Sequence, residues 1–277
     1  MKKLFGVMGD PIAHSMSPVM HNDLFNYYGI DAAYVPFHVS KGSLEAAVKG
    51  LKAIRVAGFN VTVPYKTEIM AFLDDIDPLA KAIGAVNTVV NREGKLVGYN
   101  TDGRGFVRGL TDQLPTLTDK AVLMIGAGGA AKAIYFSLAE AGIKKLDIYN
   151  RTPAKATELK KSCPFPVKTE VFDRGMAEKR LADYDILIQT TMIGMAPHIE
   201  EAPLSLNGVK PGSFASDIIY NPLETKFLRE ASSAGANIQN GIEMFVYQGA
   251  LAFEIWTGVF PDTERMKENV LKQLGGF

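Results

Sequence analysis

The stretch AVLMIGAGGAA, residues 121–131, decides the fold of this chain. Residues 121–125 are continuously apolar, which is typical of a strand buried on both faces of a parallel sheet. Residues 126–131 have the spacing G-x-G-x-x-A and open a segment that we predict to be helical up to Gly142. In such a strand–turn–helix unit, Gly126 permits the tight turn, Gly128 lets the backbone approach a pyrophosphate, and Ala131 lets the helix pack on the sheet.

The motif therefore predicts a dinucleotide site, because the helix N-terminus presents free N–H groups to the phosphates. A glycine-rich turn that only packs is the alternative, and the strand and helix around the motif argue against it. Further predicted strands at residues 146–149, 185–189 and 214–219 continue the rhythm of a doubly wound parallel sheet. The predicted contacts in the turn are Gly126, Ala127, Gly128, Gly129 and Ala130.

The residues after the next strand indicate which dinucleotide binds. NAD sites usually carry an acid there, which holds the ribose 2′-hydroxyl. This chain has Asn150, Arg151 and Thr152, followed by Lys155, and no acid before Glu158. The arginine guanidinium is planar and always charged, which suits a 2′-phosphate, so the sequence favours NADP over NAD. Solvated charges at the start of a helix are the alternative interpretation.

The first hundred residues alternate predicted strands and helices, which indicates a second α/β domain with a largely parallel sheet. Ser17 suits a helix N-cap and Pro18 the first helical position. Residues 85–91 and 95–99 predict a hairpin, which we expect to form an antiparallel edge of the sheet. We expect other strands at 4–8, 33–39 and 58–63, and helices at 17–29, 43–57, 241–257 and 262–274.

The composition of the chain excludes several classes of protein. Its 277 residues are 47% apolar and 22% charged, which is ordinary for a globular protein and long enough for about two domains. The formal net charge is zero, so a general basic surface for nucleic acid or acidic membrane is absent. The single cysteine, Cys163, forms no intrachain disulfide, and the four histidines have no metal-binding spacing. With no signal-peptide core and no long apolar run, we expect a cytoplasmic protein without a metal site.

Three polar segments are candidates for a substrate site. Ser15 and Ser17 lie two residues apart where a helix begins, so their hydroxyls and the nearby N–H groups could hold a carboxylate. Lys66 follows one predicted strand, and Asp102 stands between another strand and a helix. Open α/β sheets bind ligands beyond the carboxyl ends of their strands, although each residue alone is more often structural.

Together these segments resemble the shikimate dehydrogenase family, whose members interconvert 3-dehydroshikimate and shikimate with NADP. The matching segments are GDPIAHSMSP (9–18), GAVNT (84–88), DIIYNP (217–222) and GIEMFVYQ (241–248), and the resemblance covers nearly the whole chain. It implies a substrate domain with a mixed sheet, residues 1–104 plus 242–277, and a Rossmann-type NADP domain, residues 105–241. It also places the active site in the cleft between the two domains.

The resemblance implies a role for each matching residue. Lys66 and Asp102 form the catalytic pair, in which the Lys66 ammonium donates a proton to the ring ketone and Asp102 orients it. The expected substrate-binding residues are Ser15, Ser17, Thr62, Asn87, Asp102, Tyr220 and Gln248. Beyond the glycine-rich turn, the expected cofactor contacts are Asn150, Arg151, Thr152, Lys155, Thr191, Gly241 and Met244, with Met244 near the nicotinamide.

The chain departs from the family in one loop, where Gln189 and Met192 replace the Asn and the Pro of the usual Asn-Ala-Thr-Pro. Two alternative functions remain. A quinate/shikimate dehydrogenase would take a broader substrate range or use NAD, whereas the small Ser15 and Ser17 favour shikimate. A non-catalytic sensor of pathway metabolites would have lost Lys66 or Asp102, and this chain keeps both. The expected partner is the small-molecule substrate, with no nucleic acid and no membrane, and a homodimer is one open arrangement.

Overall fold

The computed structural model describes residues 2–275. The chain divides into two compact units, of which the first comprises the residues up to Thr101 and those from Val246 onward. The second unit is Asp102–Phe245. The division after Thr101 lies three residues before the predicted one, because helix α4 (Asp102–Gln113) packs along α5 (Gly129–Glu140) from its first turn, and the division after Phe245 lies four residues beyond the predicted one. A Cβ on Gly103 would collide with the carbonyl of Ala133, so the two helices approach closely there.

The first unit is built on a six-stranded sheet in the order β2-β1-β3-β5-β6-β4. Its strands are β1 (Lys3–Gly9), β2 (Ala32–His38), β3 (Gly58–Val61), β4 (Asp75–Ile76), β5 (Thr88–Arg92) and β6 (Lys95–Tyr99). The predicted hairpin is β5–β6, and Glu93 and Gly94 at its turn both have positive φ.

The expectation of an antiparallel edge is wrong. The antiparallel strand, β5, lies inside the sheet because it pairs with β3 on one side and β6 on the other. The edge strand is β4, which runs parallel to β6. The strand also begins at Thr88 rather than at residue 85.

Helices and aromatic side chains cover both faces of this sheet. On one face, α2 (Leu44–Ala53) contributes Leu44, Val48 and Leu51 to a core with Phe59 and Val89. On the other face, α1 (Ser17–Tyr27) and the end of α9 (Ile242–Thr257) bring their rings against β1. The indole Nε1 of Trp256 donates to the carbonyl of Val89 at 2.9 Å, which ties the returning chain to the middle of the sheet.

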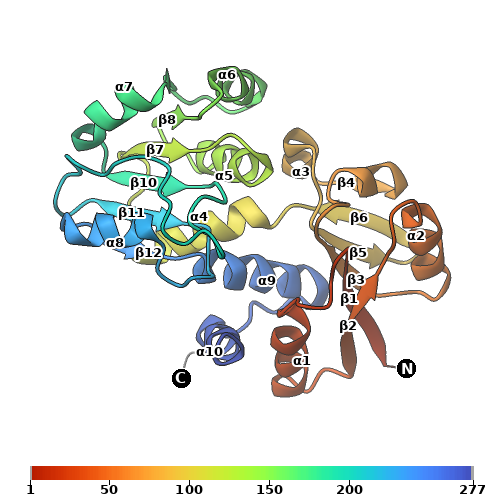
Figure 1. Cartoon of the computed structure of the whole chain (residues 1–277). Helices are drawn as coiled ribbons and strands as arrows, with labels where there is room; N and C mark the ends of the chain where they lie inside the picture. Colours follow the sequence, from red (N-terminus) through yellow and green to blue (C-terminus); the bar gives the residue numbers. More distant parts are fainter. Residues whose placement is uncertain (1, 276–277) are drawn as a thin grey trace. The chain divides into compact units, whose positions relative to one another are not determined.

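The last helix, α10 (Thr263–Gln273), packs against α1, as Figure 1 also shows. The guanidinium of Arg265 donates to both carboxylate oxygens of Asp23 at 2.6 and 2.7 Å, and Asn269 donates to the same carboxylate. Asp262 accepts the N–H of Arg265 and caps α10.

Two predicted helix features differ in the structure. Ser17 is the first residue of α1, not its N-cap: the residue before it, Met16, is the cap, and it makes no side-chain capping bond. The hydroxyl of Ser15 instead accepts the N–H of Ser17 at 3.3 Å, so Ser15 satisfies a donor that a capping residue normally satisfies. The helix expected at 43–57 ends at Ala53, since Arg55 adopts a positive φ of 55°. The remaining helices of this unit are η1 (Glu68–Phe72), a 3-10 helix, and α3 (Pro78–Ile83).

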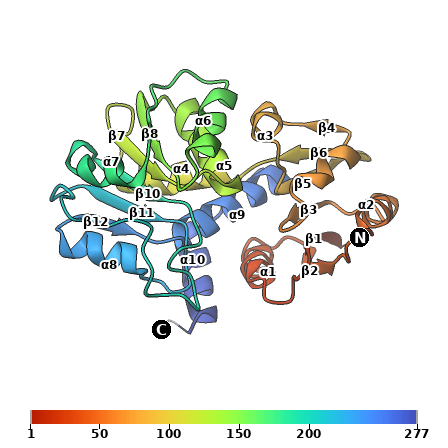
Figure 2. The same cartoon turned by 45° about the horizontal axis from the view of Figure 1, so that its top comes forward.

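The second unit is built on a parallel six-stranded sheet in the order β12-β11-β10-β7-β8-β9. In β7 the residues Val122, Leu123, Met124 and Ile125 are all buried, so both faces of the sheet are covered as the continuous apolar run predicts. Figure 2 shows α8 (Lys226–Ser233) alongside β11 and β12. The strands are β7 (Ala121–Ile125), β8 (Lys145–Tyr149), β9 (Val171–Phe172), β10 (Ile186–Gln189), β11 (Phe214–Asp217) and β12 (Asn237–Gln239).

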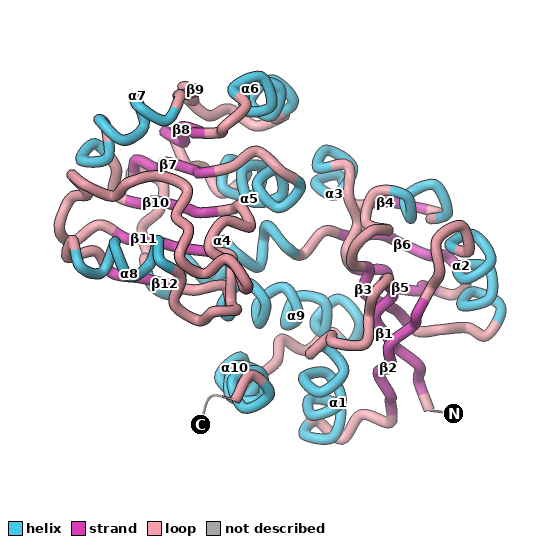
Figure 3. Tube along the Cα trace, in the orientation of Figure 1, coloured by secondary structure: helices cyan, strands magenta, loops and turns pink. Residues whose placement is uncertain are grey.

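Short helices and one long loop complete the second unit. The additional helices are α6 (Pro153–Ser162), α7 (Arg174–Lys179) and the 3-10 helix η2 (Leu181–Asp183). Residues 190–213, between β10 and β11, contain no helix or strand and appear as a continuous loop in Figure 3. No helix within residues 2–275 is long and apolar enough to cross a membrane.

Candidate active site

The carboxyl edge of the first sheet carries most of the predicted substrate residues. Strands β1, β3 and β6 end there, and the antiparallel β5 begins there. The segments that leave or enter this edge contain Ser15, Ser17, Thr62, Lys66 and Asn87. This agrees with the general position of ligand sites in open α/β sheets.

Ser15 lies two residues before α1, and Ser17 is the first residue of that helix. Ser15 is half-buried, and Ser17 is 7% exposed. The bond from the Ser17 N–H to the Ser15 hydroxyl oxygen holds the two residues in a fixed arrangement. Two hydroxyls beside a helix N-terminus are suited to an anionic group such as a carboxylate.

The turn after β3 places Lys66. The turn begins at Thr62, whose N–H donates to the carbonyl of Met8 at 2.9 Å. The carbonyl of Thr62 accepts the N–H of Tyr65 at 2.9 Å. Tyr65 is buried and donates its hydroxyl to the carbonyl of Val39 at 2.6 Å. The carbonyl of Lys66 then accepts the N–H of Val86 at 2.7 Å. The lysine is therefore half-buried on a backbone that is anchored on both sides.

Asn87 links β5 to the start of α4. Its side chain donates from Nδ2 to the Thr101 hydroxyl at 2.9 Å and accepts the Thr101 N–H on Oδ1 at 2.7 Å. Asp102 follows Thr101 directly and is the first residue of α4. The peptide bond between them keeps the backbone of Asp102 next to the edge that holds Asn87. A carboxylate at a helix N-terminus is stabilised in its ionised form.

A buried polar network lies beneath this edge, and no motif in the sequence predicts it. The hydroxyl of Tyr34 donates to Oδ1 of Asn60 at 2.6 Å. Nδ2 of Asn60 donates to the carbonyl of Asn87 at 3.1 Å and to the Thr88 hydroxyl at 3.0 Å. Asn60 interrupts the apolar strand GFNV, and a buried polar residue in such a run is the signal that could have identified it.

In the second unit, the glycine-rich turn has the geometry that its motif predicts. Gly126 has φ of 117°, and a Cβ there would collide with the hydroxyl of Thr190. A Cβ on Gly128 or Gly129 would meet nothing within 4 Å, so these positions open onto free space. Ala131 is completely buried where α5 meets the sheet. The turn therefore leaves a cradle of backbone N–H groups at the start of a helix, which fits a pyrophosphate.

A cavity of about 780 Å³ adjoins this turn. Arg151 and Asn150, after β8, line it together with Gly126 and Thr191, so four predicted cofactor residues lie in one place. A guanidinium on the wall of a cavity next to a glycine-rich turn fits the phosphorylated ribose of NADP. The other lining residues are Ile125, Tyr149, Pro153, Asp173, Arg174, Met192, Ile193, His198, Glu201, Ala202 and Pro203.

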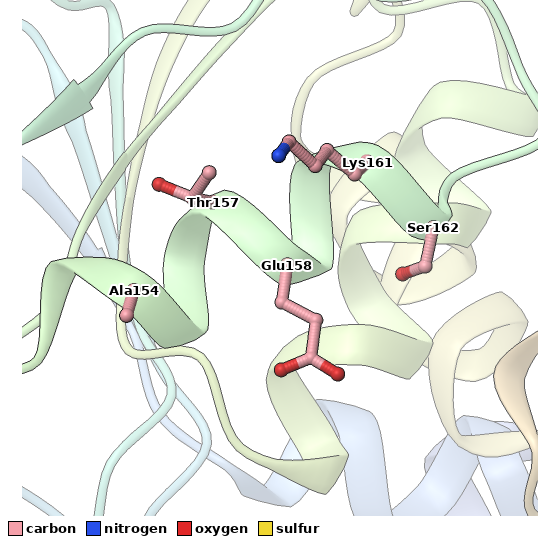
Figure 4. A pocket seen from close by; sticks show the side chains of 5 residues that line it. All are labelled: Ala154, Thr157, Glu158, Lys161 and Ser162. Carbon is pink, nitrogen blue, oxygen red and sulfur yellow. The ribbon is translucent and has the colours of Figure 1, made fainter.

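Eight predicted cofactor residues do not line this cavity: Ala127, Gly128, Gly129, Ala130, Thr152, Lys155, Gly241 and Met244. Thr152 is the N-cap of α6, and Lys155 is exposed on that helix. A separate shallow hollow on α6, seen in Figure 4, is lined by Ala154, Thr157, Glu158, Lys161 and Ser162. Arg174, the first residue of α7, and His198, in the loop between β10 and β11, also line the cavity, and no sequence motif marks either residue as a cofactor contact.

The last predicted residues lie on and before α9. Gly241 closely approaches the carbonyl of Ile218, so a side chain would collide there. Met244 and Gln248 lie half-buried on α9. Tyr220 lies with its ring centroid 5.6 Å from that of Phe245, and burial raises the pKa of its hydroxyl.

Asp217, at the end of β11, holds the loop that carries Tyr220. Its carboxylate accepts the N–H of Ile219 at 2.9 Å and the hydroxyl of Thr225 at 2.7 Å. Burial raises the pKa of Asp217 to about 7, although these two bonds act in the opposite direction. Within residues 2–275, no group of three acidic, histidine or cysteine side chains could hold a metal ion.

The chain is similar to known proteins along most of its length. Residues 7–89 match the family described as the shikimate dehydrogenase substrate binding domain, residues 110–202 match shikimate / quinate 5-dehydrogenase, and residues 241–271 match the shikimate 5'-dehydrogenase C-terminal domain. A shikimate dehydrogenase (NADP(+)) of Bacillus cereus (strain AH820) is 57% identical over 277 residues, which is 100% of both chains.

Solved structures give the same result. A shikimate dehydrogenase in complex with NADP+ is 41% identical with a TM-score of 0.89, covering 98% of this chain and 96% of the other. The shikimate 5-dehydrogenase of Listeria monocytogenes, in complex with shikimate and NAD, is 37% identical with a TM-score of 0.93, covering 97% of this chain and 96% of the other.

Proposed function

This chain belongs to the shikimate dehydrogenase family, and from that premise we propose that it reversibly reduces 3-dehydroshikimate to shikimate with NADPH. The reaction is an oxidoreductase step of aromatic amino acid biosynthesis. The observation that carries the proposal is the carboxyl edge of the first sheet, where Ser15, Ser17, Lys66 and Asn87 occupy neighbouring segments. This one edge of the sheet thus supplies groups that would bind the carboxylate and the hydroxyls of the substrate and a group that would transfer a proton.

Ser15 and Ser17 would bind the carboxylate of the substrate, with Tyr220 as an additional donor. The support for this assignment is that Ser15 and Ser17 both lie at the start of α1, which is the positive end of the helix, and that the Ser17 N–H donates to the Ser15 hydroxyl oxygen. Thr62, Asn87, Asp102 and Gln248 would bind the ring hydroxyls. The amide of Asn87 is oriented before substrate arrives because Thr101 holds both its Nδ2 and its Oδ1, while Asn60 holds the backbone carbonyl of Asn87.

Lys66 would act as the general acid. Its ammonium can donate a proton to the carbonyl oxygen as that oxygen gains negative charge, and its amine can take the proton back in the reverse direction. Asp102 would keep the lysine oriented and accept a hydrogen bond from a substrate hydroxyl. The anchored turn from Thr62 to Lys66 supports this role, since a proton donor must be held within hydrogen-bond reach.

The cavity beside the glycine-rich turn would hold the adenosine end of NADP. Arg151 would bind the 2′-phosphate, with Asn150, Thr152 and Lys155 nearby in the chain. The turn at residues 126–130 would bind the pyrophosphate, and Thr191, Gly241 and Met244 would contact the rest of the cofactor. When bound, NADPH supplies the hydride.

A turnover assay tests the proposal directly. Purified protein is mixed with shikimate or quinate and with NADP+ or NAD+, and the absorbance of the reduced nicotinamide is followed. We expect the highest kcat/KM for shikimate with NADP+. A preference for quinate or for NAD+ would select the quinate/shikimate alternative, and no turnover with any pair would remove the enzymatic proposal.

The assembly and location of the protein stay predictions. A cytoplasmic location and the absence of nucleic-acid binding are expectations from the composition, and a homodimer is one open arrangement that the sequence does not decide. The mass of the purified protein in solution, measured by light scattering, tests whether it is a homodimer.

A further inference from the structure

Gln189, one of the two departures from the family pattern, has a specific task in the structure. It is the last residue of β10, and its side chain is completely buried. Its Oε1 accepts the N–H of Thr191, and its Nε2 donates to the carbonyls of Thr191 and Ile193 at 3.3 and 3.0 Å. A single amide therefore holds both ends of the turn formed by residues 191–193.

The middle of this turn makes little apolar contact, although Ile193 beside it is half-buried. Met192, in its middle, exposes 76% of its surface. The turn does contain one further bond, from the N–H of Ile193 to the hydroxyl of Thr191 at 3.1 Å. Its conformation thus depends on polar contacts, most of which come from Gln189.

The same turn is a wall of the cavity assigned to the dinucleotide. Thr191, Met192 and Ile193 all line that cavity, as does Gly126. Thr190 fastens the two walls together, because its N–H and hydroxyl both donate to the carbonyl of Ile125, at 2.9 and 2.7 Å. The Thr190 bonds do not involve residues 191–193, so a loss of the Gln189 bonds would free these three residues while Thr190 and Arg151 stay in place.

We propose that Gln189 is a positioning residue, which sets the affinity for NADP by holding residues 191–193 in the conformation that binds the cofactor. This inference rests on the proposed assignment of the cavity to NADP. If the turn adopts the binding conformation only part of the time, the apparent affinity falls by that fraction. Since Gln189 lies on the cofactor side, the affinity for shikimate should not depend on it.

Two variants separate the donor and acceptor functions of the amide. Gln189→Leu removes both, whereas Gln189→Glu keeps an oxygen for the Thr191 N–H but replaces the Nε2 donor with a second oxygen that faces two carbonyls. Gln239→Leu is the matched control: Gln239 is buried at the end of β12 in the same sheet, and its amide has no hydrogen-bond partner within residues 2–275.

Three measurements are made on each protein. Calorimetric titration with NADP+, without substrate, gives the dissociation constant. Steady-state kinetics gives kcat and the KM values for NADP+ and shikimate. Hydrogen exchange of the ligand-free protein reports how often the amides of residues 191–195 open.

We expect Gln189→Leu to raise the Kd and KM for NADP+ about tenfold, with kcat and the KM for shikimate changed less than about twofold. Gln189→Glu should weaken the binding of NADP+ at least as much. Both variants should accelerate amide hydrogen exchange at residues 191–195. The control should keep NADP+ affinity within about twofold of wild type. If Gln189→Leu does not fold, the NADP+ affinity and the hydrogen-exchange pattern of Gln189→Glu test the proposal instead.

Unchanged NADP+ affinity in the folded Gln189 variants would overturn the inference, and so would an equal loss in Gln239→Leu. Arg151→Ala distinguishes this failure from a failure of the proposed function. If Arg151→Ala weakens NADP+ and the Gln189 variants do not, only the positioning role is wrong. If Arg151→Ala also leaves NADP+ affinity unchanged, the assignment of the cavity itself is wrong.

Discussion

His21 provides a quantitative test of how the first unit responds to acid. It lies on α1 completely buried, with its ring stacked on Tyr34 at 4.6 Å and on Phe253 at 6.3 Å. Within residues 2–275, neither ring nitrogen has a hydrogen-bond partner. Burial lowers the pKa of His21 from 6.5 to about 3, because the charged ring would have neither water nor an acceptor.

The sign of the effect follows from the two pKa values. Between pH 6.5 and about 3 the unfolded chain binds a proton at His21 that the folded protein does not, so stability falls as pH falls through this window. Within this window, each pH unit of acidification lowers the free energy of unfolding by about 1.4 kcal/mol through His21. At pH 5 the folded protein has therefore lost about 2 kcal/mol through this residue, compared with pH 8.

The assay compares wild type with His21→Phe, which keeps an aromatic ring in the stack but removes the titrating group. Urea unfolding at pH 8 and pH 5 is followed by the fluorescence of Trp256, the only tryptophan, whose ring lies 5.3 Å from that of His21. We expect the free energy of unfolding of the variant to improve relative to wild type by about 2 kcal/mol at the lower pH. His14→Gln, a change at an exposed histidine, should show no such improvement.

The comparison is made between variants because other groups titrate in the same range and cancel in the difference. A difference that stays within about 0.5 kcal/mol between the two pH values would refute the reasoning, since it would mean that His21 keeps its proton in the folded protein. A direct NMR titration of the His21 ring would then locate the error.

Three further predictions follow from other sites. Lys66→Ala should lower kcat by at least about 100-fold while shikimate still binds, measured by kinetics and calorimetry; a near-normal kcat would exclude Lys66 as the general acid. Arg151→Ala should raise the KM for NADP+ about tenfold or more and leave NAD+ nearly unaffected, so an equal loss for both cofactors would contradict its contact with the 2′-phosphate. Asp217 has a folded pKa of about 7, above its ordinary 3.8, so its contribution to stability falls as pH rises through this range. Between pH 4 and pH 8, Asp217→Asn should therefore gain stability relative to wild type by about 4 kcal/mol in urea unfolding, and a pH-independent difference would contradict this assignment.

The sequence predicted those parts of the fold that local chemistry determines. The unit from β7 to α5 was predictable because an apolar strand, a positive-φ glycine and a small helix residue each leave a mark in the sequence. The hairpin turn at Glu93 and Gly94 was predictable for the same reason. The position of β5 inside the sheet was not, since the choice of strand neighbours depends on contacts distant in the sequence.

The candidate site divides in the same way. Ser15, Lys66 and Arg151 stand next to strand or helix ends, where their positions can be read from the local pattern. Tyr34 and Asn60 were missed because their importance comes from bonds to residues more than 20 positions away. The task of Gln189 was equally hidden, as its departure from the family pattern carries no sign of which backbone groups it binds.

The discontinuous first unit has a consequence for synthesis on the ribosome. Gly58 and Val89 contact Trp256, and Asp23 forms an ion pair with Arg265. The first unit therefore cannot form all its contacts until the last part of the chain has been translated. The inserted unit has all of its own strands available sooner, and it can close while the N-terminal segment still lacks its final helices. The first unit is therefore the last to complete its fold, although its strands are synthesised first. A truncation near the C-terminus should destabilise this unit more than the inserted one.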